Sequence, residues 1–314
     1  MTLDPVVLFF LLGMVAGLLR AELRLPAAIY DFLTMLLLLT IGLKGGIELA
    51  RISLWQLLPQ LAGALLLGLL LPLLLFPLLR LVGRLKRADA ASLAAHYGSV
   101  SVGTYAVAVA YLAQQAVSHE PYMPVFVVLL EMPAIVVGIV LARGLNAETR
   151  WRAMAHEIFC GKGMVLLSGG LLIGWACGAE ALKPIQPLFF DLFKGVLALF
   201  LLEMGLITAS QMGMLRKHGL FLLLFGVLTP LASAGLGGLL ALQLGFSLGG
   251  TMLLATLAAS ASYIAVPAAM RMAVPEANPA LSLAASLGVT FPFNVLIGVP
   301  LYLQWARWLH QTGG

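Results

Sequence analysis

Long runs of apolar residues recur along the whole chain and are separated by short polar stretches. The run at 61–79 is typical, because it is rich in leucine and carries no charged side chain. A helix needs roughly 17–25 apolar residues to cross a bilayer, so the pattern predicts about ten membrane-spanning helices. The strands of a membrane barrel would instead be short and would alternate apolar with polar residues. The helices are expected at 5–19, 26–47, 54–79, 88–114, 121–142, 163–178, 187–210, 219–242, 248–272 and 279–305.

Composition strengthens this interpretation. Hydrophobic residues make up 61% of the 314 residues, charged residues only 10%, and the mean hydropathy is +1.04. Soluble domains carry about a quarter charged residues, so this chain is expected to have lipid as its solvent. In lipid every backbone N–H and C=O must be paired internally. The predicted fold class is therefore an all-α polytopic membrane protein.

The chain also contains an internal repeat. We expect residues 1–143 to form a first group of five helices, 144–162 a polar cytoplasmic connector, and 163–314 a second group of five. The same short motifs occur in the same order in both groups. The pairs are YDF (30–32) with FDL (190–192), TIGL (40–43) with EMGL (203–206), GSVS (98–101) with ASAS (259–262), and EMP (131–133) with TFP (290–292). An odd number of helices per repeat inverts one repeat against the other, as in secondary transporters.

Basic residues are distributed unequally between the two sets of loops. By the positive-inside rule, about thirteen Lys and Arg residues mark one side as cytoplasmic, against about four on the other. Both termini are therefore expected outside. The cytoplasmic set is Arg20, Arg24, Arg80, Arg84, Lys86, Arg87, Arg143, Arg150, Arg152, Lys162, Arg216, Lys217 and Arg271, and the outer set is Lys44, Arg51, Lys183 and Arg307.

Two of the predicted helices, the fourth and the ninth, contain residues that interrupt a helix. Glycines bracket the hydroxyl residues at 98–104, and the small residues at 258–262 precede Pro267. Gly and Pro weaken the helical hydrogen-bond ladder, and a half-helix that starts there directs free N–H groups toward an anion. Close packing of membrane helices is the alternative use of such small residues. The predicted anion-binding residues are Gly98, Ser99, Val100, Ser101, Ser260, Ala261 and Ser262.

Oxygen-bearing side chains near the same motifs suggest a cation site. Glu131 is a carboxylate in the middle of an apolar run, where such residues are costly and mark functional sites. It could instead pair with Lys44 or Lys194. Hydroxyl and amide oxygens suit a hard cation such as Na⁺. The candidate sodium ligands are Ser99, Ser101, Thr104, Glu131, Thr290 and Asn294.

An enzyme is the less favoured alternative. The sequence has no zinc-protease, nucleophile-elbow or Walker motif. An intramembrane hydrolase that uses Ser99 with His96 would need an unbroken helix to place both side chains on one face. The neighbouring glycines oppose this. We therefore expect a transporter and no enzymatic activity.

Several stretches resemble the cyanobacterial-type sodium-dependent bicarbonate transporter family. The resemblance covers both halves and nearly the whole chain, and AASASYIAVP and ASLGVTFPFN are long enough to be specific. The stretches are IGLKGGIE (41–48), AAHYGSVS (94–101), EMP (131–133), AASASYIAVP (258–267), PEANP (275–279) and ASLGVTFPFN (285–294).

The resemblance implies a ten-helix inverted-repeat fold with crossed broken helices in a mobile, elevator-like core beside a gate. It also implies sodium-coupled symport of bicarbonate into a prokaryotic cell across the inner membrane, with Na⁺ as the coupling ion, and a homotrimer. A small PII-like cytoplasmic regulator acts on some members. Two features differ from the family: VGTY (102–105) replaces the usual AVTF, and the connector is short. Another small anion or an organic acid, carried on the same fold, is the alternative substrate.

Overall fold

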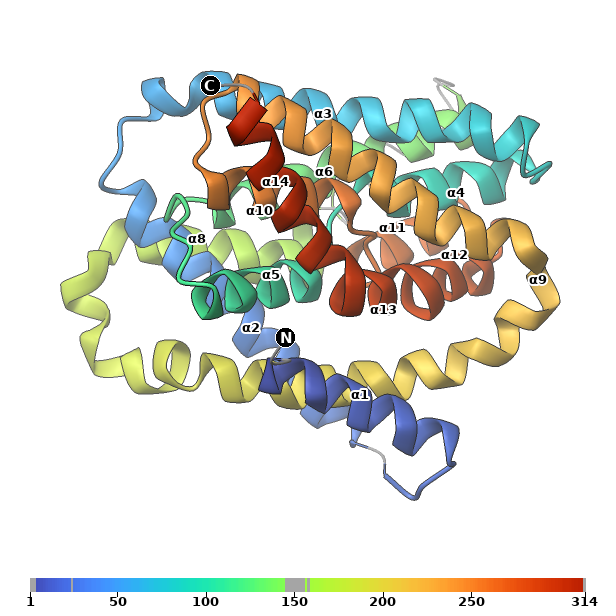
Figure 1. Ribbon diagram of the computed structural model, residues 1–314, viewed down its shortest axis with the longest axis horizontal. Coiled ribbons are helices and arrows are strands. Elements are labelled where there is room, and N and C mark those ends of the chain that lie inside the picture. Colours follow the sequence, from blue (N-terminus) through green and yellow to red (C-terminus); the bar gives the residue numbers. More distant parts are fainter. Residues whose placement is uncertain (1–3, 24, 145–155, 157–158, 313–314) are drawn as a thin grey trace.

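The computed structural model describes residues 4–23, 25–144, 156 and 159–312, and all regular secondary structure in these residues is helical (Figure 1). Most of the connector predicted at 144–162 lies outside them, as do Arg24, Arg150 and Arg152. The main helices are α1 (Pro5–Leu18), α2 (Ala27–Leu49), α3 (Leu54–Leu81), α4 (Arg87–Gly98), α5 (Val102–Gln114), α6 (Pro124–Arg143), α8 (Lys162–Leu182), α9 (Phe193–Gln243), α10 (Leu248–Ala259), α11 (Ala265–Ala273) and α14 (Val299–Thr312). The short segments are η1 (Lys183–Ile185), η2 (Pro187–Asp191), α12 (Pro279–Ala285), η3 (Ser286–Thr290), α13 (Phe291–Phe293) and η4 (Asn294–Gly298).

Seven helical stretches among the described residues are long and apolar enough to cross a membrane. They are α2, most of α3, α6, α8 with η1, each half of α9, and the run Pro279–Thr312. The other three predicted spans are shorter: α1 has 14 residues, and the fourth and ninth are each divided into two short helices. A polytopic helical membrane protein is confirmed, and the total of ten spans stays a prediction.

Helix boundaries differ from the sequence prediction in the second half. The seventh and eighth predicted spans are joined in α9, which departs from helical geometry at Gly219, where φ is +78°. Glycine adopts this left-handed conformation readily. The last span is not a uniform α-helix, because it contains the π-helical segments η3 and η4. Pro292 and Pro300 have no N–H to donate to the carbonyl four residues earlier, which interrupts the regular ladder here.

Two glycine seams join helices from opposite halves of the chain. In the first, α1 lies against the first half of α9, and a Cβ at Gly13 would collide with the Leu202 carbonyl. In the second, α2 lies against α8, and a Cβ at Gly174 would collide with the Leu43 carbonyl. Small residues allow membrane helices to approach this closely. We call α1, α2, α8 and the first half of α9 the seam layer; α1 and that part of α9 form the lower edge of Figure 1.

The remaining helices form a second group, which we call the broken-helix layer. Here α3 packs against α4 and α6, and the second half of α9 packs against α10 and α14. In Figure 1, α3 and the second half of α9 lie along the upper edge. Every described residue of α10 from Gly249 onward is buried, as are the last nine residues of α4. The two broken helices therefore lie inside this layer.

Two acidic side chains connect the halves at the starts of the broken helices. Glu120, just before α6, accepts hydrogen bonds from the Ser247 N–H at 2.6 Å and the Ser247 hydroxyl at 3.0 Å, at the start of α10. Asp89, in the first turn of α4, accepts the Asn278 N–H at 2.7 Å, at the start of α12. Each broken helix thus begins beside the loop that precedes the last span of the other half.

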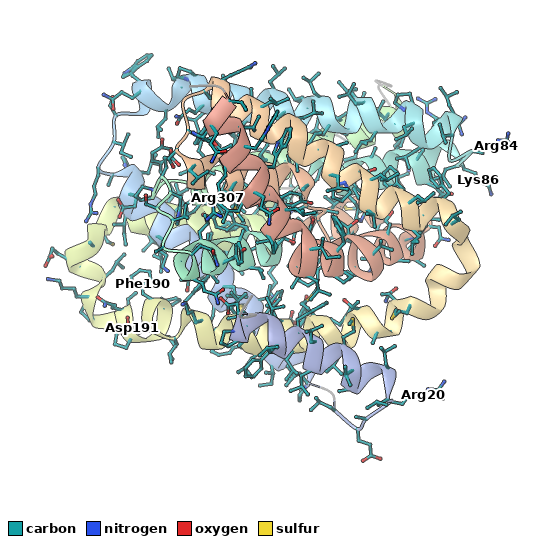
Figure 2. All side chains as sticks on the ribbon, in the orientation of Figure 1. Arg20, Arg84, Lys86, Phe190, Asp191 and Arg307 are labelled. Carbon is teal, nitrogen blue, oxygen red and sulfur yellow. The ribbon has the colours of Figure 1, made fainter. Side chains whose placement is uncertain are left out.

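Several of the labelled charged residues lie toward the two ends of the long axis, whereas Arg307 lies between them. Figure 2 shows Arg20, Arg84 and Lys86 at one end, and Phe190 and Asp191 at the opposite end. Arg87 is held at the first end, because its Nε donates to the Leu141 carbonyl at 2.7 Å. This placement agrees with the grouping of basic loops that the positive-inside count used.

Candidate functional site

The first helix break lies between α4 and α5. After Gly98 the chain becomes extended at Ser99, with φ −94° and ψ −176°, and α5 begins at Val102. Ser101 caps α5, because its Oγ accepts the Thr104 N–H at 3.1 Å and the Thr104 hydroxyl at 2.9 Å. A serine cap of this kind satisfies one of the N–H groups left free at a helix start. The predicted interruption of the fourth span is therefore present.

The second break lies between α10 and α11. Ser260 is extended, with φ −85° and ψ 162°, and α11 begins only at Ala265. The Ser260 hydroxyl donates to the Leu257 carbonyl at 2.8 Å, which holds the last turn of α10. Ser262 has a weaker local contact, accepting the Val266 N–H at 3.4 Å. The predicted interruption of the ninth span is also present.

The two breaks touch and are hydrogen-bonded to each other. The Ser101 N–H donates to Ser260 Oγ at 2.9 Å, and the Ser262 N–H donates to the His96 carbonyl at 2.8 Å. Two of the expected anion donors therefore already have acceptors. Other N–H groups in the breaks have no acceptor among the described residues, namely those of Val100, Val102, Tyr263 and Ile264.

A small cavity is lined by these four residues. Both breaks line it, along with Glu131 from α6, Leu38 from α2 and Gly163 from α8; the break residues are Val100, Ser101, Val102, Ser262, Tyr263 and Ile264. Its volume is about 10 Å³, which is room for about one water molecule. A second cavity of about 80 Å³ shares Glu131, Gly163 and Ile264 with it. The site therefore lies between the two layers, and the cavity at its centre is too small for an anion such as bicarbonate.

Glu131 is the acidic residue of this site. It is 3% exposed, and its Oε2 is buried with no hydrogen-bond partner in the structure. It forms no ion pair with Lys44 or Lys194; Lys44 lies over the Phe193 ring, 4.5 Å from its centroid. Its other oxygen is close to α8, because a Cβ at Gly163 would lie 3.3 Å from it. A buried carboxylate without a partner is costly and is stabilised by a cation.

Thr290 and Asn294 are buried in the last span, and their side chains are already bonded. Thr290 Oγ1 donates to the Gly226 carbonyl at 2.7 Å and lies 2.6 Å from the Tyr97 hydroxyl. Asn294 donates to the Ala259 carbonyl at 2.9 Å and accepts the Tyr302 hydroxyl at 2.7 Å. Neither residue lines the small cavity. Their role as sodium ligands stays a prediction, and their visible role is to fix the broken helices.

The serine and histidine of the hydrolase alternative are not paired. His96 Nδ1 is bonded to the Ser92 carbonyl at 2.7 Å, and the Ser99 hydroxyl donates to the Glu131 carbonyl at 3.3 Å. A nucleophile needs a base within hydrogen-bond reach, and this pair does not provide one. Sequence reasoning missed five residues of the cavity lining, namely Leu38, Val102, Gly163, Tyr263 and Ile264. Tyr263 and Ile264 had a signal, since both lie within the AASASYIAVP stretch, and Val102 lies within the glycine-bracketed stretch 98–104.

Two broken helices that meet at an oxygen-lined cavity between helix layers define a helical membrane protein of the secondary-transporter class. The chain belongs to the Na⁺-dependent bicarbonate transporter superfamily, whose family model matches residues 5–307. It is a transporter and not an enzyme. No curated protein matches the chain.

Proposed function

We propose that this protein is a symporter that uses the sodium gradient to carry bicarbonate into the cell. The observation that carries the proposal is the small cavity, which is lined by four residues of the two breaks whose N–H groups have no acceptor among the described residues, and by Glu131, whose buried Oε2 has no partner there. N–H groups at broken helices suit an anion, and the carboxylate suits a cation. The two ions of a symporter would thus bind side by side.

Bicarbonate would be held mainly by backbone groups. Val100, Val102, Tyr263 and Ile264 line the cavity, and their N–H groups would donate to the anion. The starts of α5 and α11 add the positive ends of their helix dipoles. The cavity must widen to hold an anion of four heavy atoms, so the bound state differs from this one.

Sodium would bind beside the anion on Glu131, with the hydroxyls of Ser101 and Ser262 as further ligands. Coupling to sodium has a physical reason. An anion that enters a negative-inside cell works against about 2.3 kcal/mol per charge per 100 mV. A co-transported cation removes this electrical cost and adds the driving force of its own gradient.

The glycine seams and acidic connections support the inverted repeat. Gly13 and Gly17 of α1 face α9, as Gly170 and Gly174 of α8 face α2. This reciprocal packing, in which the first helix of each half contacts the second span of the other half, is expected if residues 1–143 and 163–314 are related by inversion. The cavity lies between the layers, so we infer that the seam layer is the gate and the broken-helix layer the mobile core. The homotrimer, the prokaryotic inner membrane, both termini outside and the PII-like regulator remain inferences from the resemblance and the charge pattern.

The test is uptake of labelled bicarbonate into vesicles that contain the purified protein. We expect saturable uptake that depends on an inward sodium gradient and is not supported by a potassium gradient of the same size. Unlabelled nitrate, acetate and larger organic acids, added in turn as competitors, identify the preferred anion. Absence of sodium-dependent uptake in correctly inserted protein would refute the proposal. Preferential competition by an organic acid would instead favour the alternative substrate.

A further inference from the structure

A separate cavity of about 190 Å³ lies beside the crossing of the two broken helices. It is lined by residues of α4 and α11 and of the segment after α11, among them Ser92, His96, Met270, Arg271 and Pro275. No residue of α5 or α10 lines it. The start of α4 and the end of α11 are both at the basic end of the molecule, because Arg87 bonds α6 there and Arg143 bonds the Ala273 carbonyl.

Arg271 brings a positive charge to the lining of this cavity, and it is an exposed residue. It forms no ion pair among the described residues, and no carboxylate lines the cavity. Two acidic side chains lie near the cavity, and each has another contact. Asp89 accepts the Asn278 N–H, and Glu276 pairs with Arg143 at 3.3 Å. A guanidinium in this setting suits the two oxygens of a planar oxyanion.

His96 adds a hydrogen-bond acceptor to the same cavity. It is 2% exposed, and its Nδ1 lies 2.7 Å from the Ser92 carbonyl. A carbonyl only accepts, so Nδ1 carries the proton and Nε2 of the neutral ring is an acceptor. Nε2 has no partner among the described residues. The cavity therefore combines a cationic donor with an imidazole acceptor that has no donor among the described residues.

We propose that this cavity is a second anion site, on the cytoplasmic side of the central site, for an oxyanion that also carries a hydroxyl group. Arg271 donates hydrogen bonds to the two charged oxygens, and His96 Nε2 accepts a hydrogen bond from the hydroxyl group. Bicarbonate has both features, whereas nitrate is planar and singly charged but has no hydroxyl. This identification of the ligand rests on the proposed function.

The position of the cavity makes it a release site. The His96 carbonyl accepts the Ser262 N–H, so one backbone contact separates the residues of this cavity from those of the central cavity. An anion that leaves the central site toward the basic end meets Arg271 next. Occupancy from the cytoplasm would then slow further uptake.

Right-side-out membrane vesicles test this, because their lumen corresponds to the cytoplasm. The lumen is loaded with potassium bicarbonate and no sodium, and the initial rate of sodium-driven uptake of labelled bicarbonate is measured. We expect lumenal bicarbonate to inhibit uptake in the wild type. Arg271→Gln should raise the half-inhibiting lumenal concentration about ten-fold, the effect of losing a charge-assisted contact. Arg84→Gln removes an exposed charge at the same end and should not change it.

Two outcomes would overturn the second site. One is unchanged lumenal inhibition in Arg271→Gln. The other is an equal rise in the external half-saturating concentration, which would place the effect of Arg271 at the central site. Failure of the wild type to take up bicarbonate with sodium would instead refute the proposed function, so the two failures are distinguishable.

Anion selectivity tests the role of His96 independently. Lumenal nitrate should inhibit the wild type more weakly than bicarbonate. His96→Asn keeps a donor near the Ser92 carbonyl and removes the Nε2 acceptor, so the preference for bicarbonate over nitrate should fall several-fold. An unchanged preference in folded His96→Asn protein would contradict the hydroxyl contact. If His96→Asn does not fold, the Arg271 variant alone decides.

Discussion

Each broken helix begins with a twelve-residue half-helix, α4 or α10, and continues past a serine in extended conformation. The two serines, Ser99 and Ser260, form different hydrogen bonds. Ser99 donates to the carbonyl of Glu131, whereas Ser260 donates within its own helix and accepts the Ser101 N–H from the other break. Ser260 therefore supports the first break, whereas Ser99 is bonded to the backbone of Glu131, and residues of both breaks line the cavity with Glu131. Similar backbone conformations at Ser99 and Ser260 therefore do not imply that the two serines have the same role.

The same asymmetry appears in the final span of each half. The motif pairing aligns Glu131 with Thr290. Glu131 has an unpartnered oxygen beside the cavity, whereas the Thr290 hydroxyl is bonded to Tyr97 and Gly226. One half thus supplies the charge and the other supplies a structural contact. We infer that duplication provided the scaffold and that one half was specialised for the cation.

The largest expected effect comes from filling the space between the breaks. In Gly103→Val, the new side chain would meet the Tyr263 hydroxyl of the second break and come within 2.9 Å of Phe200 in the seam layer. We expect almost complete loss of sodium-dependent bicarbonate uptake. Gly235→Val is the matched control, because a Cβ there meets nothing within 4 Å. Uptake by correctly inserted Gly103→Val at the rate of this control would show that the breaks need not approach closely.

The second prediction contrasts Glu131 with Thr290. Glu131→Gln removes the charge from a buried site, so the sodium concentration for half-maximal uptake should rise about ten-fold or more. Thr290→Val removes a hydroxyl that is hydrogen-bonded to Gly226 and Tyr97. This variant should therefore be less stable, with little change in sodium dependence. Sodium titration of uptake measures both. A larger sodium effect in Thr290→Val would reverse the assigned asymmetry.

These contrasts show what the sequence could and could not predict. Glycines around Ser99 and Ser101, and Pro267 after Ser262, indicated both interruptions because their effect on a helix is local. The bond from the Ser101 N–H to Ser260 joins residues 159 positions apart. No local pattern encodes such a contact.

Some differences have a different physical origin. The role of Thr290 and Asn294 as sodium ligands stays a prediction, and composition does not show that their side chains are bonded to Tyr97 and Tyr302. Gly163 gave no signal, because it became part of the site only through the packing of α8 near Glu131. The all-helical class was predictable because lipid requires internally paired backbone groups.

A smaller effect separates Gly98 from its counterpart Ala259. A Cβ at Gly98 would lie 2.5 Å from Pro72 Cδ and 3.0 Å from Ala134, whereas Ala259 already carries a Cβ in the same position of the repeat. We expect Gly98→Ala to destabilise the protein by about 1–3 kcal/mol through overpacking. Unfolding in mixed micelles by titration with SDS measures this, with Gly235→Ala as the control. Equal stability of the two variants would mean that α3 can move away from α4.

The smallest expected effect distinguishes Ser260 from Ser262. Ser260→Ala removes the acceptor of the Ser101 N–H, and leaving a buried donor unsatisfied costs about 1–3 kcal/mol. We expect the lower part of this range, because the N–H lies beside a cavity that can hold one water molecule. Ser262→Ala removes a weaker contact, the 3.4 Å hydrogen bond from the Val266 N–H. It also removes the hydroxyl of a residue that lines the cavity. It should therefore be nearly as stable as the wild type and should raise the half-maximal sodium concentration a few-fold. SDS titration and sodium titration on both variants separate the two roles. If Ser260→Ala alters sodium dependence more than stability, Ser260 contributes directly to ion binding, and the roles assigned to Ser260 and Ser262 are wrong.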